Sequence, residues 1–315
     1  MIKLLPDVDT GIDDALALFF LSEAQKKGQL EIPGCTTVGG NTEVAQTSRN
    51  TLQIWEMAGA KIPVASGAES PLLSSLNTAP LVHGDDGLGN TFLPPPKGNT
   101  SEESAADMTL RISHQYAGEL TLLTTAPLTN LGAALMHDPT LAGRIRNLVC
   151  MGGAVFTGNV SAVAEANIYN DPEAARIVFR SGIETIMIVL DVTHKVYWEE
   201  SDLQPLEDAG NERADFLLQI IRFISGAYEN LTGWRRCVLH DPLAAAVCLY
   251  PDLVKTEKFH ADVELRGELT RGMTVIDRRG RNPLSERNIN VALEVDAERF
   301  KSMLMKSLLS WVNEG

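Results

Sequence analysis

The sequence predicts an α/β fold in which a mostly parallel central sheet is flanked by helices, of the open, doubly wound type. Two observations favour this class. Short apolar stretches of strand length alternate with longer helical patterns, and the strand candidates are apolar throughout, which fits burial on both faces. With 315 residues, 44% of them hydrophobic, and no repeat or clear linker, we expect a single catalytic domain over residues 1–315.

The expected elements follow one another along the chain as strand and helix pairs. IKLL precedes DALALFFLSEAQKKG, CTTV precedes EVAQTSRNTLQIWEMAGA, and ELTLLTT precedes LTNLGAALMHD. NLVCM, PEAARIVFRSG and ETIMIVL continue the alternation. Residues 66–103, rich in Gly, Pro, Ser and Asn, predict a long loop of the kind that often carries function. Residues 201–250 predict mainly helices, residues 254–292 strands, and residues 296–313 a terminal helix.

Charge and cysteine usage exclude several classes of protein. A net charge of −14 and a pI near 4.9 argue against nucleic acid and anionic membranes as partners. The four cysteines lie in apolar contexts without CxxC spacing and predict buried, reduced thiols: Cys35, Cys150, Cys237 and Cys248. The first residues lead directly into a strand, and no apolar run reaches the length of a membrane span. We therefore expect a cytoplasmic protein.

The stretch DVDTGIDD at residues 7–14 carries four aspartates directly after the first strand. Like charges this close need compensation. Capping of the next helix by Asp13 and Asp14 is the simplest interpretation, but it leaves Asp9 unexplained. An EF-hand loop is excluded because Gly11 and Ile12 stand where that loop needs an acid or amide and then glycine.

Two interpretations of this stretch as a site remain. A haloacid dehalogenase phosphatase would use Asp7 as phosphoryl acceptor and Asp9 as acid, with Mg²⁺, and would leave the other two aspartates without a role. A hard cation held by carboxylates, one of which takes a proton from a bound water, uses most of the set. Ligands collect at the carboxyl ends of parallel strands, where this stretch lies.

Three later segments offer further polar groups. TTAPLTN places Thr125 at the end of a strand, although, for this segment alone, an ordinary turn with Thr129 or Asn130 as helix cap is the favoured interpretation. MGGAVFTGNVSAVAEANIYNDPEAA supplies a mixture of amide and carboxylate groups suited to hydroxyl recognition, with Asp171 as a plain helix cap. LHDPLAAAV places His240 and Asp241 at the start of an apolar helix, where Asp241 is a cap or a metal ligand and His240 a candidate acid.

Taken together and in order, these motifs resemble the inosine-uridine preferring nucleoside hydrolases. The resemblance covers DVDTGIDDALAL, VGGN, HGDDGLG, TAPLTN, MGGA, the segment ending in DPEAA, and HDPLAA, over roughly residues 3–250. It implies a nucleoside hydrolase-like fold, a bound Ca²⁺, and hydrolysis of the N-glycosidic bond of ribonucleosides to free base and ribose. It also implies a homodimer or homotetramer.

The resemblance implies a role for each matching residue. Asp9, Asp14, Asp241 and the Thr125 carbonyl are the expected calcium ligands. Asp9 is also the expected general base for the metal-bound water, and His240 assists departure of the base. Substrate contacts are expected as follows: Asp13 at the ribose 2′-hydroxyl, Asn167 at the diol, Asn159 and Glu165 at the 5′-hydroxyl, Asn41 and Met151 nearby, and His83 in the wall beside the base.

Departures from the family pattern leave the choice of base open. Thr10 replaces the usual proline after DxD, and Ala166 replaces a phenylalanine that many members carry. Tyr228 and Trp234 are candidates for contact with the base, although packing within the core explains each of them equally well. Purine against pyrimidine preference is therefore not predicted beyond a weak lean toward broad specificity. Two alternatives to the hydrolase stay open: the haloacid dehalogenase-like phosphatase, and a calcium-dependent nucleoside or sugar binding protein, which would need neither Asp9 as base nor His240 as acid.

The expected chemistry agrees with these residue types. Glycosidic cleavage passes through an oxocarbenium-like state, so the site should place negative charge near the sugar and deliver a proton to the leaving base. Direct displacement by water, with inversion, is the expected outcome.

Overall fold

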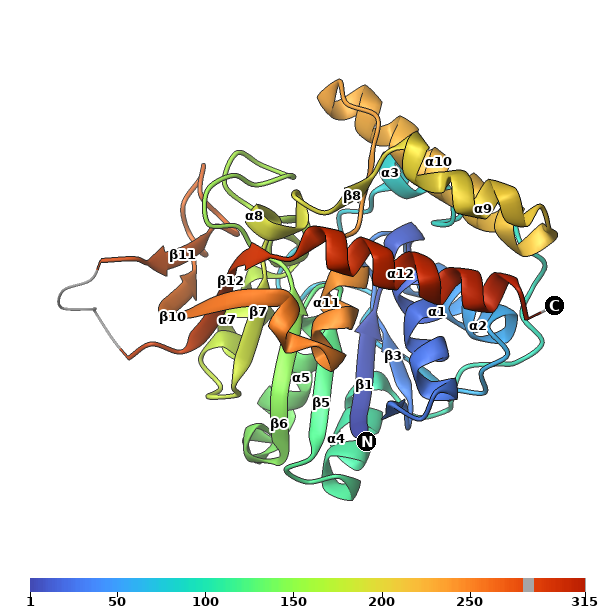
Figure 1. Cartoon of the computed structure of the whole chain (residues 1–315). Coiled ribbons are helices and arrows are strands. Elements are labelled where there is room, and N and C mark those ends of the chain that lie inside the picture. Colours follow the sequence, from blue (N-terminus) through green and yellow to red (C-terminus); the bar gives the residue numbers. More distant parts are fainter. Residues whose placement is uncertain (280–285, 315) are drawn as a thin grey trace.

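A large, mostly parallel sheet forms the centre of the molecule (Figure 1). The computed structural model describes residues 1–279 and 286–314. Over these residues, ten strands form one sheet in the order β11-β10-β12-β7-β6-β5-β1-β3-β4, and β2 pairs with the first residues of β1. The strands are β1 (Ile2–Val8), β2 (Leu30–Glu31), β3 (Cys35–Thr37), β4 (Val64–Ser66), β5 (Leu120–Thr124), β6 (Ile145–Met151), β7 (Thr185–Ile188), β10 (Val254–Val263), β11 (Thr274–Asp277) and β12 (Ile289–Val295).

The sheet from β4 to β12 is parallel, as expected, and antiparallel pairing appears only at its other end, where β10 pairs with β12 and β11. The short strands β8 (Tyr197–Trp198) and β9 (Cys237–Val238) form a separate antiparallel pair. The first strand runs beyond IKLL to Val8, so Asp7 lies inside it and Asp9 directly follows it.

Helices cover both faces of the sheet. α1, α11 and α12 pack on one another on one side, and α4, α5 and α7 form a contiguous group on the other (Figure 1). The longer helices are α1 (Ile12–Lys26), α2 (Val44–Met57), α4 (Ala105–Gln115), α5 (Thr129–His137), α7 (Pro172–Phe179), α9 (Gln204–Ala209), α10 (Glu212–Thr232), α11 (His240–Leu249) and α12 (Ala297–Val312). The one-turn helices α3 (Pro80–His83), α6 (Ala166–Asn170) and α8 (Leu190–Thr193) lie in the loops.

The expected elements are confirmed with small changes of boundary. The loop at 66–103 contains α3, and the strands expected at 254–292 continue to Val295. α12 begins one residue later than expected because Asp296 is its cap and accepts a hydrogen bond from the Arg299 amide. Asp171 caps α7 in the same way, as expected.

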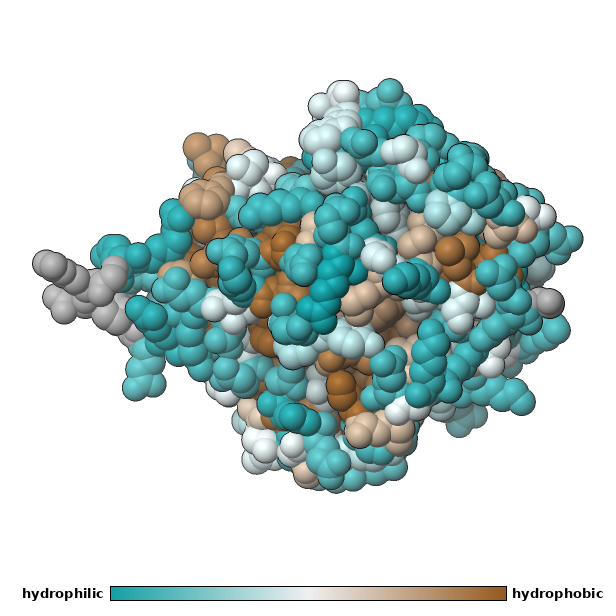
Figure 2. All heavy atoms as spheres, viewed as in Figure 1, coloured by the Kyte–Doolittle hydropathy of each residue, from teal (hydrophilic) through white to brown (hydrophobic). Residues whose placement is uncertain are grey.

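Burial follows the hydrophobic pattern. α1 is almost entirely buried, from Ile12 to Ala24, and its Phe19 ring stacks on Trp311 of α12 at 4.0 Å. The four cysteines are free thiols, three of them buried and Cys248 partly so. Hydrophilic residues are spread over much of the face in Figure 2, with apolar residues in small groups between them. Within the described ranges, no helix is both long and apolar enough to cross a membrane.

Candidate active site

The candidate residues gather at one edge of the sheet because the strands that carry them are parallel. Asp9 follows β1, Asn41 follows β3, Thr125 follows β5, and Met151 ends β6. The hydrogen bonding between β1 and β5 continues past the end of β5, where the Thr125 amide donates to the Asp7 carbonyl at 3.1 Å. This edge faces α3, α8 and the β8–β9 pair (Figure 1).

Three carboxylates converge there from two helix termini. Asp13 and Asp14 lie in the first turn of α1, and Asp241 lies in the first turn of α11. One oxygen from each carboxylate lies within 4.8 Å of the others, and all three side chains are buried. Helix N-termini favour acidic groups, so both helices contribute to holding this cluster, named here the carboxylate cluster.

Asn41 links Asp9 to the carboxylate cluster. Its backbone amide donates to Oδ2 of Asp9 at 2.8 Å, and its side-chain Nδ2 donates to Oδ1 of Asp9 at 3.2 Å and to Oδ2 of Asp14 at 3.3 Å. A Cβ at Gly40 would lie 1.9 Å from Oδ2 of Asp9, so only glycine lets the loop approach this carboxylate. The loop after β3 therefore holds Asp9 in place.

Burial and mutual repulsion shape the electrostatics of these acids. Burial, followed by repulsion from Asp14, raises the pKa of Asp9 well above its usual value. Burial raises the pKa of Asp13 to about 6, and burial with repulsion from Asp13 raises that of Asp14 to about 6. The pKa of Asp241 is also raised well above its usual value, by burial and then by the other acids. A bound cation would offset this repulsion.

The donor set fits a hard cation. Carboxylate and carbonyl oxygens are the ligands that Ca²⁺ and Mg²⁺ prefer. Oδ1 of Asp13 is buried and has no hydrogen-bond partner within the described part of the chain, which leaves it free for a cation or a substrate hydroxyl. The Thr125 hydroxyl donates to Oδ1 of Asp14 at 2.7 Å, and the Thr125 carbonyl accepts from Nδ2 of Asn167 at 2.9 Å. Thr125 therefore adjoins the carboxylate cluster through both groups.

The predicted ribose contacts come from one short segment around α6. Asn167 also donates through Nδ2 to the Met151 carbonyl at 3.1 Å. Both oxygens of Glu165 are used locally, accepting from the amides of Gly153, Asn167 and Ile168 at 2.9 to 3.1 Å, and burial raises its pKa. Asn159 is exposed, and its Oδ1 accepts from the amide of Ala166 at 3.0 Å. The segment thus folds around the N-terminus of α6.

His240 is held at both ring nitrogens. Nδ1 lies 2.7 Å from Oγ1 of Thr193, and Nε2 lies 2.7 Å from the hydroxyl of Tyr228 on α10. The pKa of His240 is held well below its usual value by burial first, and then by the nearby histidines His194 and His83. His240 and Tyr228 form a hydrogen-bonded pair, named here the acid pair, with Thr193 behind it.

His83 and Trp234 differ in their placement. Nδ1 of His83 accepts from the Ile12 amide at 3.1 Å, at the start of α1, so Nε2 carries the proton of the neutral ring. Burial lowers the pKa of His83 to about 4. Trp234 is 45% exposed and contacts the Tyr197 ring edge-on, with centroids 5.1 Å apart. The structure thus brings His83 to the site, while Trp234 packs on Tyr197 and not on the carboxylate cluster.

Two contacts were not predicted from the sequence. Thr193, in the DVTH stretch after β7, pairs with His240, and its only signal is its position after a strand that ends at the site edge. Asp7 has its side chain on Thr36 and Asn130, which donate to its Oδ1 at 2.7 Å each. Asp7 therefore supports the neighbouring strand and α5.

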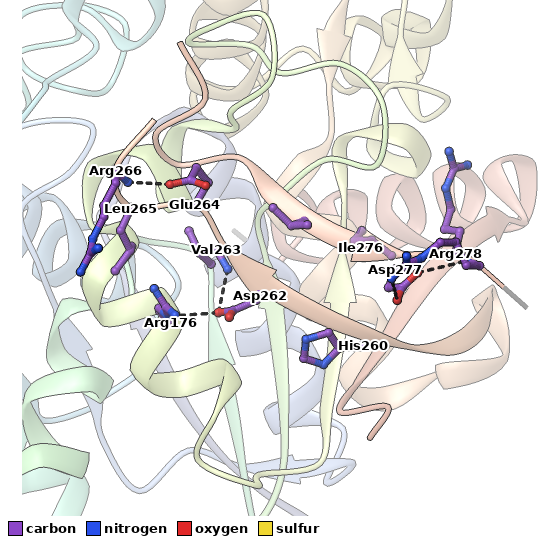
Figure 3. A pocket seen from close by; sticks show the side chains of 12 residues that line it. Arg176, His260, Asp262, Val263, Glu264, Leu265, Arg266, Ile276, Asp277 and Arg278 are labelled. Carbon is purple, nitrogen blue, oxygen red and sulfur yellow. Dashed lines mark hydrogen bonds and ion pairs between the residues drawn. The ribbon is translucent and has the colours of Figure 1, made fainter. Parts of the chain in front are cut away.

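A separate cavity lies away from this edge, between β10, β11 and α7 (Figure 3). It measures about 1160 Å³, and an ion pair between Arg176 and Asp262 lies in its wall. None of the predicted site residues lines it. Its size alone therefore does not make it the active site.

The chain is similar to known nucleoside hydrolases over almost its whole length. The chain is 37% identical to "Uridine nucleosidase 1" of Arabidopsis thaliana, over 96% of this chain and 93% of that protein. It is 34% identical to the "Inosine-uridine preferring nucleoside hydrolase" of Crithidia fasciculata, over 97% of both chains. The solved structure of a "Purine-Preferring Ribonucleoside Hydrolase from Gardnerella vaginalis" matches with a TM-score of 0.93 and 34% identity, over 99% of this chain and 100% of that one. The family model "Inosine-uridine preferring nucleoside hydrolase" matches residues 4–302, and the chain belongs to this family.

Proposed function

We propose that this chain hydrolyses the N-glycosidic bond of ribonucleosides to free base and ribose by means of a Ca²⁺ held by Asp9, Asp14, Asp241 and the Thr125 carbonyl. Membership of the family makes the chain an N-glycosyl hydrolase that acts on ribonucleosides. The observation that supports this metal and its ligands is the buried convergence of Asp13, Asp14 and Asp241 at the carboxyl edge of the parallel sheet, to which Asn41 links Asp9. The match over residues 4–302 includes the motifs that a phosphatase would leave unexplained, and it favours no alternative.

When bound, Ca²⁺ supplies a Lewis acid that accepts roughly six to eight oxygens, so positions remain for water and two ribose hydroxyls beyond the protein ligands. Asp9 takes a proton from the attacking water. Its carboxylate is suited to that role because Asn41 holds it from two sides, at 2.8 and 3.2 Å, which keeps its orientation fixed.

The ribose is positioned by the side chains around the carboxylate cluster. Asp13 accepts from the 2′-hydroxyl, and its unpartnered Oδ1 supports this role. Asn167, held by the carbonyls of Thr125 and Met151, contacts the diol, with Asn41 nearby. Asn159 and Glu165 lie toward the 5′-hydroxyl. The acids of the carboxylate cluster also stabilise the positive charge that develops on the sugar.

The departing base lies on the side of the acid pair. His240 delivers a proton to the base through its contact with Tyr228, and Thr193 sets the orientation of the ring. His83 forms part of the wall beside the base, and its neutral ring offers the N–H group at Nε2 to the base. Trp234 lies farther out, so we propose that it contacts the base only as part of the outer wall.

The base preference is not decided by the relatives, because they are named for uridine, for inosine and uridine, and for purines. We propose broad specificity. We also propose a cytoplasmic location, which the four free thiols support, and assembly into a homodimer or homotetramer. Light scattering on the purified chain tests the assembly.

The test is chromatography of free base and ribose after the protein, supplied with Ca²⁺, is incubated separately with inosine, uridine, adenosine and cytidine. Release of base and ribose in equal amounts supports the hydrolase and ranks the four substrates. A protein that binds these nucleosides and Ca²⁺ but releases no base is a binding protein, and this outcome contradicts the proposal.

A further inference from the structure

A stacked arginine, Arg236, lies close enough to the acid pair for its charge to contribute to the lowered pKa of His240, and it has no role in the mechanism above. It precedes β9 and lies four residues before His240. Its guanidinium carbon lies 4.1 Å from the ring centroid of Trp234 and 5.3 Å from that of Tyr197. Contacts with two aromatic rings hold the cation in one place.

Arg236 forms no ion pair with any acid among the residues that the structure describes. No hydrogen bond or ion pair of this side chain joins it to another described residue, and its buried Nε has no acceptor. The neighbouring Arg235, by contrast, pairs with Glu229 at 2.9 Å. The chain carries a net charge of −14, so acids are abundant, and an immobilised arginine without one has its terminal N–H donors available to a ligand.

Arg236 lies on the side of the site where we place the leaving base. β9 pairs with β8 and leads directly into His240 at the start of α11. The His194 ring lies 5.6 Å from the His240 ring, and the pKa of His194 is lowered by burial and then by the charge of Arg236. The guanidinium therefore acts on the His240 side of the site, while the carboxylates occupy the ribose side.

We propose that Arg236 contacts the departing base and stabilises the negative charge that builds on it as the glycosidic bond breaks. This inference rests on the proposed function. In that step the electron pair of the C1′–N bond moves to the base, and the water oxygen bonds to C1′. One water proton passes to Asp9, and a proton from the acid pair reaches the base. Arg236 transfers no proton. It best serves leaving groups that spread charge onto an exocyclic oxygen, such as oxo-substituted bases and nitrophenolate.

The test compares Arg236→Gln with the matched variant Arg235→Gln on inosine and on 4-nitrophenyl riboside. The nitrophenolate leaves without needing a proton, so this substrate reports charge stabilisation separately from proton delivery. We expect Arg236→Gln to lower kcat/KM for both substrates by about tenfold to a hundredfold, Arg236→Lys to recover part of the loss, and Arg235→Gln to stay within about twofold of the wild type. Tyr197→Leu, which removes a stacking ring but keeps the charge, should lose less than Arg236→Gln.

Three results would overturn the inference. Equal activity of the two glutamine variants excludes a contact with the base. A loss on inosine alone would assign Arg236 to proton delivery, and an equal loss in Tyr197→Leu would assign it to holding β8 against β9. Failure of the proposed function is read separately, in the wild type, as no base released from any nucleoside.

Discussion

At the scale of single residues, the site depends on side chains that are held by their neighbours before any substrate arrives. Asn41 holds Asp9, Thr125 holds Asp14, and Thr193 with Tyr228 holds His240. Such fixed geometry lowers the cost of reaching the transition state.

Asp9→Asn should lower kcat for inosine by at least about a thousandfold, because it replaces the proposed base, which is also a proposed calcium ligand, with a neutral amide that cannot accept the proton. Steady-state assays with saturating Ca²⁺ measure this, with Asp252→Asn as the matched control, since Asp252 is exposed and pairs with Arg299. Near-normal activity of Asp9→Asn would refute its assignment as the base.

His240→Ala should lower turnover of inosine by about a hundredfold or more, because inosine needs a proton on its leaving group. An activated nitrophenyl riboside should lose much less. If both substrates suffered equally, proton delivery to the base would be the wrong role for His240.

Thr193→Val keeps the shape of the side chain and removes the hydrogen bond to Nδ1 of His240. Losing one such bond is worth about 1.4 kcal/mol, or tenfold in kcat for inosine, with KM little changed. The exposed Thr140→Val is the control. A change in KM alone would show that Thr193 shapes binding rather than orienting the histidine.

At the scale of elements, two helix termini and four strand ends build the site, so its geometry depends on how α1 is packed. α1 lies between α11 and α12, and Trp311 of α12 stacks on Phe19 and donates from Nε1 to the Met57 carbonyl at 3.0 Å. This contact anchors α12 over the helix that carries Asp13 and Asp14.

Trp311→Ala should lower the free energy of unfolding by about 3–5 kcal/mol, because it leaves a large cavity beneath α12. Denaturant titration measures this, with the 84% exposed Leu269→Ala as a control that should change stability by less than about 0.5 kcal/mol. A loss below about 1 kcal/mol would show that α12 contributes little to holding α1.

At the scale of the whole molecule, the alternation of strands and helices was predictable because apolar periodicity fixes element type. The antiparallel end of the sheet was not, since β10 to β12 show no signal of direction. The motif residues were predictable at the ends of strands, whereas the side chain of Asp7 was not placed, because only packing turns it toward Thr36 and Asn130. Thr193 and Arg236 were not predictable either, because neither belongs to a recognised motif. The contact of Thr193 with His240 and that of Arg236 with Tyr197 form only in the folded chain.

Calcium dependence of the hydrolysis is best tested by measuring base release by the wild type after chelation and again after Ca²⁺ is restored, with bound metal counted in each state. We predict loss of inosine hydrolysis in the metal-free protein and recovery as one Ca²⁺ per chain is bound, with no such binding in Asp14→Asn. Full activity in protein shown to be metal-free would contradict a calcium-dependent reaction, because the carboxylate cluster would then have another purpose.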